Sequence, residues 1–133
     1  VARSVPMICA NPDLVVERGE RIIPCAGAMA LYYEQLGGEV RIAGKPHSPI
    51  YEACLSAARE VHGEFSKDRV LAIGDGMPTD VKGAINAGLE LLYIAGGIHA
   101  ADYALNGEID ETLLKDYLQK EGAAPGWWMP RLA

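Results

Sequence analysis

Short apolar runs alternate with longer amphipathic stretches along most of this chain. The runs are rich in β-branched residues, which is typical of buried strands, whereas the stretches repeat apolar residues at helical spacing. The pattern predicts strands at 3–10, 14–16, 22–23, 40–43, 70–73 and 91–94, and helices at 26–36, 49–62, 80–87, 100–105 and 109–120. The segments 14–16 and 22–23 are expected to form a hairpin.

The order of these elements indicates an α/β fold. After residue 40 strands and helices alternate, which is typical of a mainly parallel, Rossmann-like sheet with helices on both faces. Strands 70–73 and 91–94 should be adjacent and parallel, joined through helix 80–87 by a right-handed crossover. The tail from residue 122 is rich in Gly and Pro, and its two tryptophans are expected to anchor it.

Composition narrows the class of protein. A chain of 133 residues, half of them hydrophobic, is enough for one compact domain and too short for two full ones. The net charge of −6 argues against nucleic acid as the main partner. No apolar run approaches a membrane span, and nothing resembles a signal peptide. Cys9, Cys25 and Cys54 are odd in number, which favours free thiols and a cytoplasmic location. The sequence leaves open whether the chain forms a homo-oligomer.

Two loops carry the candidate chemistry, GKPHSP at 44–49 and GDGMPTD at 74–80. The second follows a predicted strand and opens a predicted helix, so Asp75 and Asp80 should lie at the carboxyl edge of the sheet, where open α/β folds bind ligands. Lys45, in the first loop, is expected within reach of Asp75, where its charge would suit a phosphate. This grouping indicates phosphate chemistry assisted by a hard metal ion.

Mg²⁺ is the ion that such a site would take, because it prefers oxygen ligands and keeps several waters. Asp75 is expected to be a direct ligand, and Asp80 either to bind a metal-bound water or to hold the loop amides. Thr79 is expected to cap the following helix. Both carboxylates could instead be ordinary turn and capping residues.

Other polar residues carry weaker signals. Asn11 and Asp13 flank a proline, as in an Asx turn. The three histidines, His47, His62 and His99, are scattered without the spacing of a metal site.

Several strings together resemble one family. GKPHSPIYEACL, VLAIGDGMPTDVKGAINAGLELLYIAGG, ICANPD and PCAGAMALYYEQLGG are similar to the NagD-like, nitrophenylphosphatase-type hydrolases of the haloacid dehalogenase superfamily. The resemblance implies a Rossmann-like core with an α/β cap, Mg²⁺ and a phosphoaspartyl intermediate. It implies that Lys45 stabilises the nucleophile and the phosphoryl charge, that Asp75 binds the metal, and that Asp80 supports it. Asn11 and Asp13 would lie on the cap near the entrance, in contact with substrate.

The chain departs from the family at the nucleophile. The D-x-D-G string that supplies the attacking aspartate does not occur, nor does the hydroxyl-bearing second motif. We therefore expect a fragment, with residues 1–43 ending a cap and 44–133 forming the second half of a core. The expected function is Mg²⁺-dependent hydrolysis of a small phosphorylated metabolite, with the missing N-terminal half as partner and the chain inactive by itself.

Two other functions stay open. The chain could be a complete, non-catalytic module that binds a phosphate ligand or a partner protein. A nucleotide-binding Rossmann unit is a weaker alternative, because no G-x-G-x-x-G follows a strand.

Overall fold

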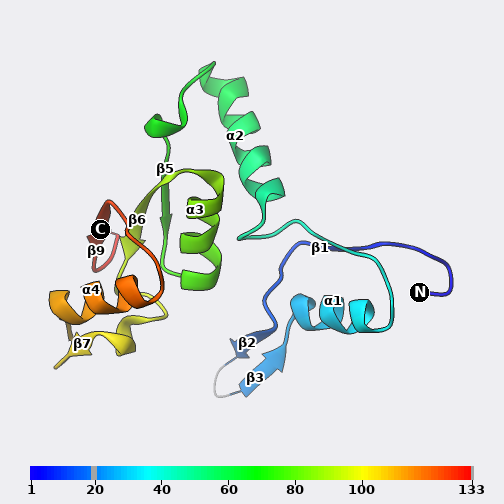
Figure 1. The fold of residues 1–133 in the computed structure, drawn as a ribbon, viewed down its shortest axis with the longest axis horizontal. Coiled ribbons are helices and arrows are strands. Elements are labelled where there is room, and N and C mark those ends of the chain that lie inside the picture. Colours follow the sequence, from blue (N-terminus) through cyan, green and yellow to red (C-terminus); the bar gives the residue numbers. More distant parts are fainter. Residues whose placement is uncertain (19–20, 133) are drawn as a thin grey trace. The chain divides into compact units, whose positions relative to one another are not determined.

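The computed structural model describes residues 1–18 and 21–132 (Figure 1). The chain divides into two compact units, Val1–Cys54 and Leu55–Ala133, and each is described by itself. We expected the cap to end at residue 43 and the core to begin at residue 44, and this boundary stays a prediction.

The first unit contains two pairs of strands and a helix. Strand β1 (Met7–Cys9) pairs in parallel with β4 (Val40–Ile42), so their carboxyl ends meet. Strands β2 (Val15–Arg18) and β3 (Arg21–Pro24) pair antiparallel, which confirms the predicted hairpin. Helix α1 (Ala26–Gln35) follows β3 directly and ends before Gly37, whose φ of +83° suits a residue without a side chain.

The start of α1 is fastened to the segment that follows β1. The Gly27 N–H donates to the carbonyl of Asp13 at 3.0 Å, and the Cys25 N–H donates to that of Leu14 at 2.9 Å. A Cβ on Gly27 would collide with the Pro12 carbonyl, so only glycine permits this approach. The turn at residues 11–13 is therefore held by the helix.

Helix α2 (Ser48–His62) begins in the first unit and ends in the second. It confirms the predicted helix at 49–62, and it ends at Gly63, which has a φ of +75°. Leu55 is its buried residue.

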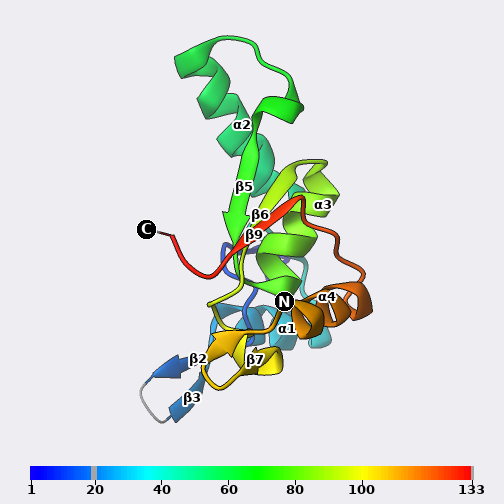
Figure 2. The same cartoon turned by 90° about the vertical axis from the view of Figure 1, so that its left-hand side faces the viewer.

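A three-stranded parallel sheet forms the centre of the second unit. Strand β6 (Glu90–Ile94) lies between β5 (Leu71–Gly74) and β9 (Trp127–Met129), as Figure 2 shows. A π-helical turn (Met77–Val81) and helix α3 (Lys82–Ala87) connect β5 to β6. The predicted adjacent parallel pair is thus confirmed, and with it the α/β class.

The remaining elements of this unit are short, apart from one helix. Helix α4 (Glu111–Lys120) begins at Asp110, whose carboxylate accepts from the N–H groups of Thr112 and Leu113, both at 2.9 Å. Two 3₁₀ turns (Lys67–Arg69 and Ala100–Asp102) and two short strands, β7 (Ala104–Leu105) and β8 (Glu108–Ile109), complete it.

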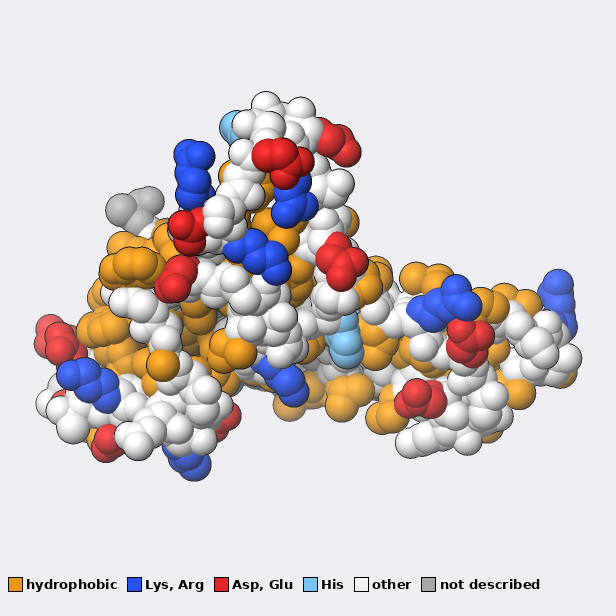
Figure 3. Space-filling model, turned by 45° about the horizontal axis from the view of Figure 1, so that its top comes forward, with side chains coloured by type: hydrophobic (Ala, Val, Ile, Leu, Met, Phe, Trp, Pro, Cys, Tyr) orange, Lys and Arg blue, Asp and Glu red, His pale blue; other side chains and the backbone are white. Residues whose placement is uncertain are grey.

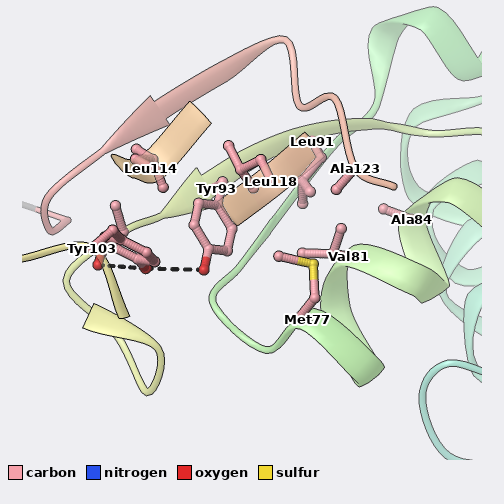
Figure 4. Close-up of a cluster of buried hydrophobic side chains, with 10 residues drawn as sticks. Met77, Val81, Ala84, Leu91, Tyr93, Tyr103, Leu114, Leu118 and Ala123 are labelled. Carbon is pink, nitrogen blue, oxygen red and sulfur yellow. Dashed lines mark hydrogen bonds between the residues drawn. The ribbon is translucent and has the colours of Figure 1, made fainter. Parts of the chain in front are cut away.

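The core of the second unit lies between the sheet and helices α3 and α4 (Figure 4). Leu91 and Tyr93 point from one face of β6 toward Val81, Leu114 and Leu118. Since strand residues alternate between faces, the intervening positions lie on the opposite face. There Ile73 and Trp127 flank Leu92 and are 50% and 57% exposed.

Two buried phenols cross this core in one hydrogen-bonded chain. The Tyr103 hydroxyl donates to the carbonyl of Ala95 at 2.8 Å, so the Tyr93 hydroxyl must donate to Tyr103, at 3.0 Å. Burial raises the pKa of both phenols above their usual value, and it raises that of Tyr117 to about 12.

One expectation about secondary structure is wrong, and the tail contains a strand that the pattern did not predict. Residues 100–105 form a 3₁₀ turn followed by a hairpin, because Asn106 and Gly107 adopt φ of 53° and 83°, which makes a two-residue turn between β7 and β8. The tail contains strand β9, whose three residues are too few to show a period. Trp128 packs against the core and Trp127 stays exposed, so the tail is anchored by sheet pairing and by one of the two indoles.

Many apolar side chains reach the surface among the charged ones (Figure 3). None of the helices in the described part of the chain is long and apolar enough to cross a membrane.

Candidate functional site

The loop after β5 is organised around the Asp80 side chain. Its Oδ2 accepts from the N–H of Gly76 at 3.0 Å and from that of Asp75 at 3.3 Å. A Cβ on Gly74 would lie 2.7 Å from this oxygen and closer still to Cβ and Cγ of Asp80, so glycine is required there. Asp80 therefore holds the loop amides, which was one of its two expected roles.

The turn that follows begins earlier than the sequence suggested. Gly76 occupies the N-cap position, and its carbonyl accepts from the N–H of Asp80 at 2.8 Å and of Val81 at 3.0 Å. The expected cap by Thr79 is wrong, because Pro78 already lies in the first turn and Thr79 lies inside it.

Asp75 is held by the loop that follows β6. Its Oδ2 accepts from the Ile98 N–H at 3.0 Å. A Cβ on Gly97 would collide with the Asp75 side chain, so the two loops are in close contact. Since β5 and β6 are parallel neighbours, both loops lie at one carboxyl edge, and the expected position of Asp75 at this edge is confirmed.

His99, in the same loop, is a residue that the sequence pattern did not single out. Its Nε2 lies 3.3 Å from the Met77 nitrogen, whose hydrogen it accepts. Its Nδ1 lies 3.7 Å from a carboxylate oxygen of Asp102, and its ring lies 5.7 Å from that of Tyr117. The available signal was its place just after a strand that neighbours the Asp75 strand.

Lys45 lies in the first unit, at the carboxyl edge of β1 and β4. The segment after β4 is fastened to that after β1, since the Ala43 N–H donates to the Cys9 carbonyl at 2.9 Å. A Cβ on Gly44 would collide with the Ala10 carbonyl and lie 2.7 Å from Cδ of Pro12. Parallel pairing thus brings the loop of Lys45 beside the turn at 11–13.

Asn11 and Asp13 form the expected Asx turn. The Asn11 Oδ1 accepts from the Asp13 N–H at 3.0 Å, and the Asn11 Nδ2 donates to Sγ of Cys25 at 3.5 Å. Both residues are exposed, as is Lys45. The structure brings these three residues to one edge of the first unit and Asp75 and Asp80 to one loop of the second. That Lys45 lies within reach of Asp75 stays a prediction.

The donors of the second unit fit Mg²⁺ in kind. Among residues 1–18 and 21–132, no group of three or more His, Cys, Asp or Glu side chains could hold a metal. Mg²⁺ does not require such a cluster, because it retains waters and binds one or two carboxylates plus substrate oxygens. Asp75, held through a single oxygen at a strand end, is the side chain that could bind it, with Asp80 beside it.

A family model and several known proteins match this chain. The family model described as HAD-hydrolase-like matches residues 42–120, which is more than half of the chain. The chain therefore belongs to the haloacid dehalogenase-like hydrolases, as its loop strings indicated.

Two known phosphatases place it among the NagD-like members of this family. The chain is 35% identical over 92 residues to dihydroxyacetone phosphatase of Corynebacterium glutamicum, covering 68% of this chain and 32% of that protein. It is 29% identical over 103 residues to ribonucleotide monophosphatase NagD of Escherichia coli, covering 77% of this chain and 38% of that protein.

A solved structure is similar over nearly the whole chain. A haloacid dehalogenase-like hydrolase from Brucella suis matches with a TM-score of 0.69 and 52% identity, covering 99% of this chain and 46% of that one. This chain thus spans between about a third and a half of the lengths of these three proteins.

Proposed function

We propose that this chain is part of a Mg²⁺-dependent phosphatase that hydrolyses small phosphate esters through a phosphoaspartyl intermediate. The observation that carries the proposal is the position of Asp75. It lies at the carboxyl end of the parallel strand β5, and the Ile98 N–H fixes one oxygen of its carboxylate. Relatives named dihydroxyacetone phosphatase and ribonucleotide monophosphatase support small phosphate esters as substrates.

Asp75 and Asp80 have different roles in this proposal. Asp75 would bind Mg²⁺, which supplies charge neutralisation at the phosphoryl oxygens when bound. Asp80 would support the site by keeping the amides of Asp75 and Gly76 in place, as its contacts at 3.3 and 3.0 Å allow. Its acceptor oxygen is committed to the loop, so we assign it the supporting position.

Lys45 would supply a positive charge to the attacking carboxylate and to the phosphoryl group. Asn11 and Asp13, in the adjacent loop, would contact the leaving part of the substrate. The shared edge of β1 and β4 supports this grouping, because a cation and hydrogen-bonding groups lie in neighbouring loops there.

The attacking aspartate would come from sequence outside these residues. Covalent phosphoryl transfer needs a carboxylate in line with the leaving oxygen, and the D-x-D-G string is absent from this chain. Strand β5 is an edge strand of its sheet, with Leu71 and Ile73 45% and 50% exposed. An edge of this kind suits pairing with a further strand, which supports the N-terminal part of the same protein as partner. A cytoplasmic location stays part of the proposal.

The runner-up is a non-catalytic α/β module that binds a phosphate ligand. The absence of the D-x-D-G string from this chain favours the module. The hydrogen bond that holds the Asp75 carboxylate at the end of β5 favours the enzyme.

The experiment is an assay of the natural full-length protein with p-nitrophenyl phosphate and a panel of small phosphate esters, with Mg²⁺ or with a chelator. We expect turnover that requires Mg²⁺, and a loss of several powers of ten in kcat for Asp75→Asn. Asp116→Asn, an exposed aspartate on α4, is the matched control. Activity that survives Asp75→Asn or the chelator would reject the proposal, and phosphate binding without any turnover would favour the module.

A further inference from the structure

Every N–H group from Asp75 to Val81 has an acceptor. Those of Asp75 and Gly76 donate to the Asp80 carboxylate, and those of residues 79–81 donate to the Gly76 carbonyl. Pro78 has no N–H. The remaining group, the N–H of Met77, donates to Nε2 of His99 at 3.3 Å.

His99 thus completes the cap of the turn from another segment. The first N–H groups of a helical turn have no partner inside it, and a side chain at the N-cap usually accepts one. Gly76 stands at the N-cap and has no side chain to offer. Met77 is 7% exposed, so water is a poor substitute for the imidazole.

The surroundings of His99 favour the tautomer that can accept. A backbone N–H donates only to a ring nitrogen that carries no hydrogen, so the Met77 contact requires the hydrogen on Nδ1. Nδ1 lies 3.7 Å from a carboxylate oxygen of Asp102, which stabilises a hydrogen at that nitrogen. The Tyr117 ring packs beside the imidazole, with 5.7 Å between the two ring centroids.

We propose that His99 is a positioning residue for the Asp75 loop. This inference rests on the proposed function, in which Asp75 binds Mg²⁺. The Ile98 N–H holds the Asp75 carboxylate at 3.0 Å, and His99, the next residue, holds the backbone two positions beyond Asp75. The loop after β6 therefore fixes both the side chain and the following backbone, and groups that orient a metal ligand in this way affect metal affinity.

The test compares two amides of different length in the natural full-length protein. His99→Gln places an acceptor oxygen near the position of Nε2, whereas the shorter His99→Asn does not reach Met77. His99→Leu is a second variant without an acceptor, in case His99→Asn does not fold. His62→Leu, at an exposed histidine of α2, is the control.

Two quantities are measured, the hydrogen-exchange rate of the Met77 amide by NMR and the Mg²⁺ concentration for half-maximal turnover. For His99→Asn or His99→Leu we expect exchange at least about tenfold faster, since one hydrogen bond contributes roughly that factor, and a several-fold higher Mg²⁺ requirement. His99→Gln should recover most of both, and His62→Leu should change neither.

Unchanged Met77 exchange in the variants without an acceptor would overturn the contact. Faster exchange with an unchanged Mg²⁺ requirement would overturn the positioning role and leave only a structural one. A wild-type protein whose turnover ignores Mg²⁺ would overturn the proposed function and this inference with it, and the Met77 exchange rate would still report whether the contact exists.

Discussion

Oδ2 of Asp80 accepts a hydrogen bond from the N–H of Gly76 at 3.0 Å and thereby closes the loop that presents Asp75. The same oxygen lies 3.3 Å from the N–H of Asp75 itself. Asp80 and Asp75, the aspartate that we propose to bind Mg²⁺, are therefore connected through the backbone.

Replacement of Asp80 by alanine should lower stability. It removes the acceptor of two amides, and loss of a hydrogen bond to a charged group costs about 1.5–3 kcal/mol. Asp80→Asn keeps an oxygen in place and should cost less, and it should also reduce turnover less than Asp75→Asn does. Urea unfolding of the wild type, Asp80→Ala and Asp80→Asn measures the effect on stability, with Asp116→Ala as control. Equal stability of Asp80→Ala and wild type would contradict the closing role.

Lys45 should affect turnover more than folding, because its side chain is exposed. In the natural full-length protein, Lys45→Ala should lower kcat by roughly a hundredfold to a thousandfold, the usual effect of removing one group that stabilises transition-state charge. Lys45→Arg should recover part of it. Steady-state kinetics with Lys115→Ala as control test this, and a kcat near the wild-type value in Lys45→Ala would remove Lys45 from the site.

These 133 residues alone should not hydrolyse phosphate esters. In the proposed site Lys45 would stabilise charge and Asp75 would bind metal, and neither would attack phosphorus. Loss of the covalent path costs about 1.4 kcal/mol for each power of ten in rate. The measurement compares the chain with a version extended upstream through D-x-D-G, both with p-nitrophenyl phosphate and Mg²⁺. Circular dichroism must first show that the short chain is folded. Robust Mg²⁺-dependent turnover by it would require a nucleophile within residues 1–133.

Stability should fall at alkaline pH. Burial raises the pKa of Tyr93 and Tyr103 above 10 and that of Tyr117 to about 12. Below pH about 10 these phenols are neutral in both states, and their contribution to stability is complete. As the pH rises further, the unfolded chain loses phenol protons that the folded chain retains, so the free energy of unfolding decreases, for Tyr117 until about pH 12.

Urea unfolding at a series of pH values from about 8 to 11 measures this decrease. Tyr93→Phe should reduce the slope, and it should leave the bond from Tyr103 to Ala95 intact. A slope identical to that of the wild type would show that Tyr93 does not contribute.

The sequence by itself determined the elements that have a clear period and the loops that follow them. Apolar runs at 70–73 and 91–94 with a helix between them specify adjacent parallel strands, because a connection of that length through a helix has few other solutions. The position of Asp75 at the carboxyl edge followed from this order alone. The family followed from the loop strings, which resemble those of the NagD-like hydrolases.

Only the tertiary structure decided which groups contact one another. Residues 127–129 form a strand because they pair with β6. Three residues are too few for their own pattern to predict this pairing. The pairing of β1 with β4 brings the turn at 11–13 beside the loop of Lys45 across some thirty residues of intervening chain. His99 looked isolated in the sequence because its partner is a backbone N–H, and a backbone group leaves no trace in side-chain spacing.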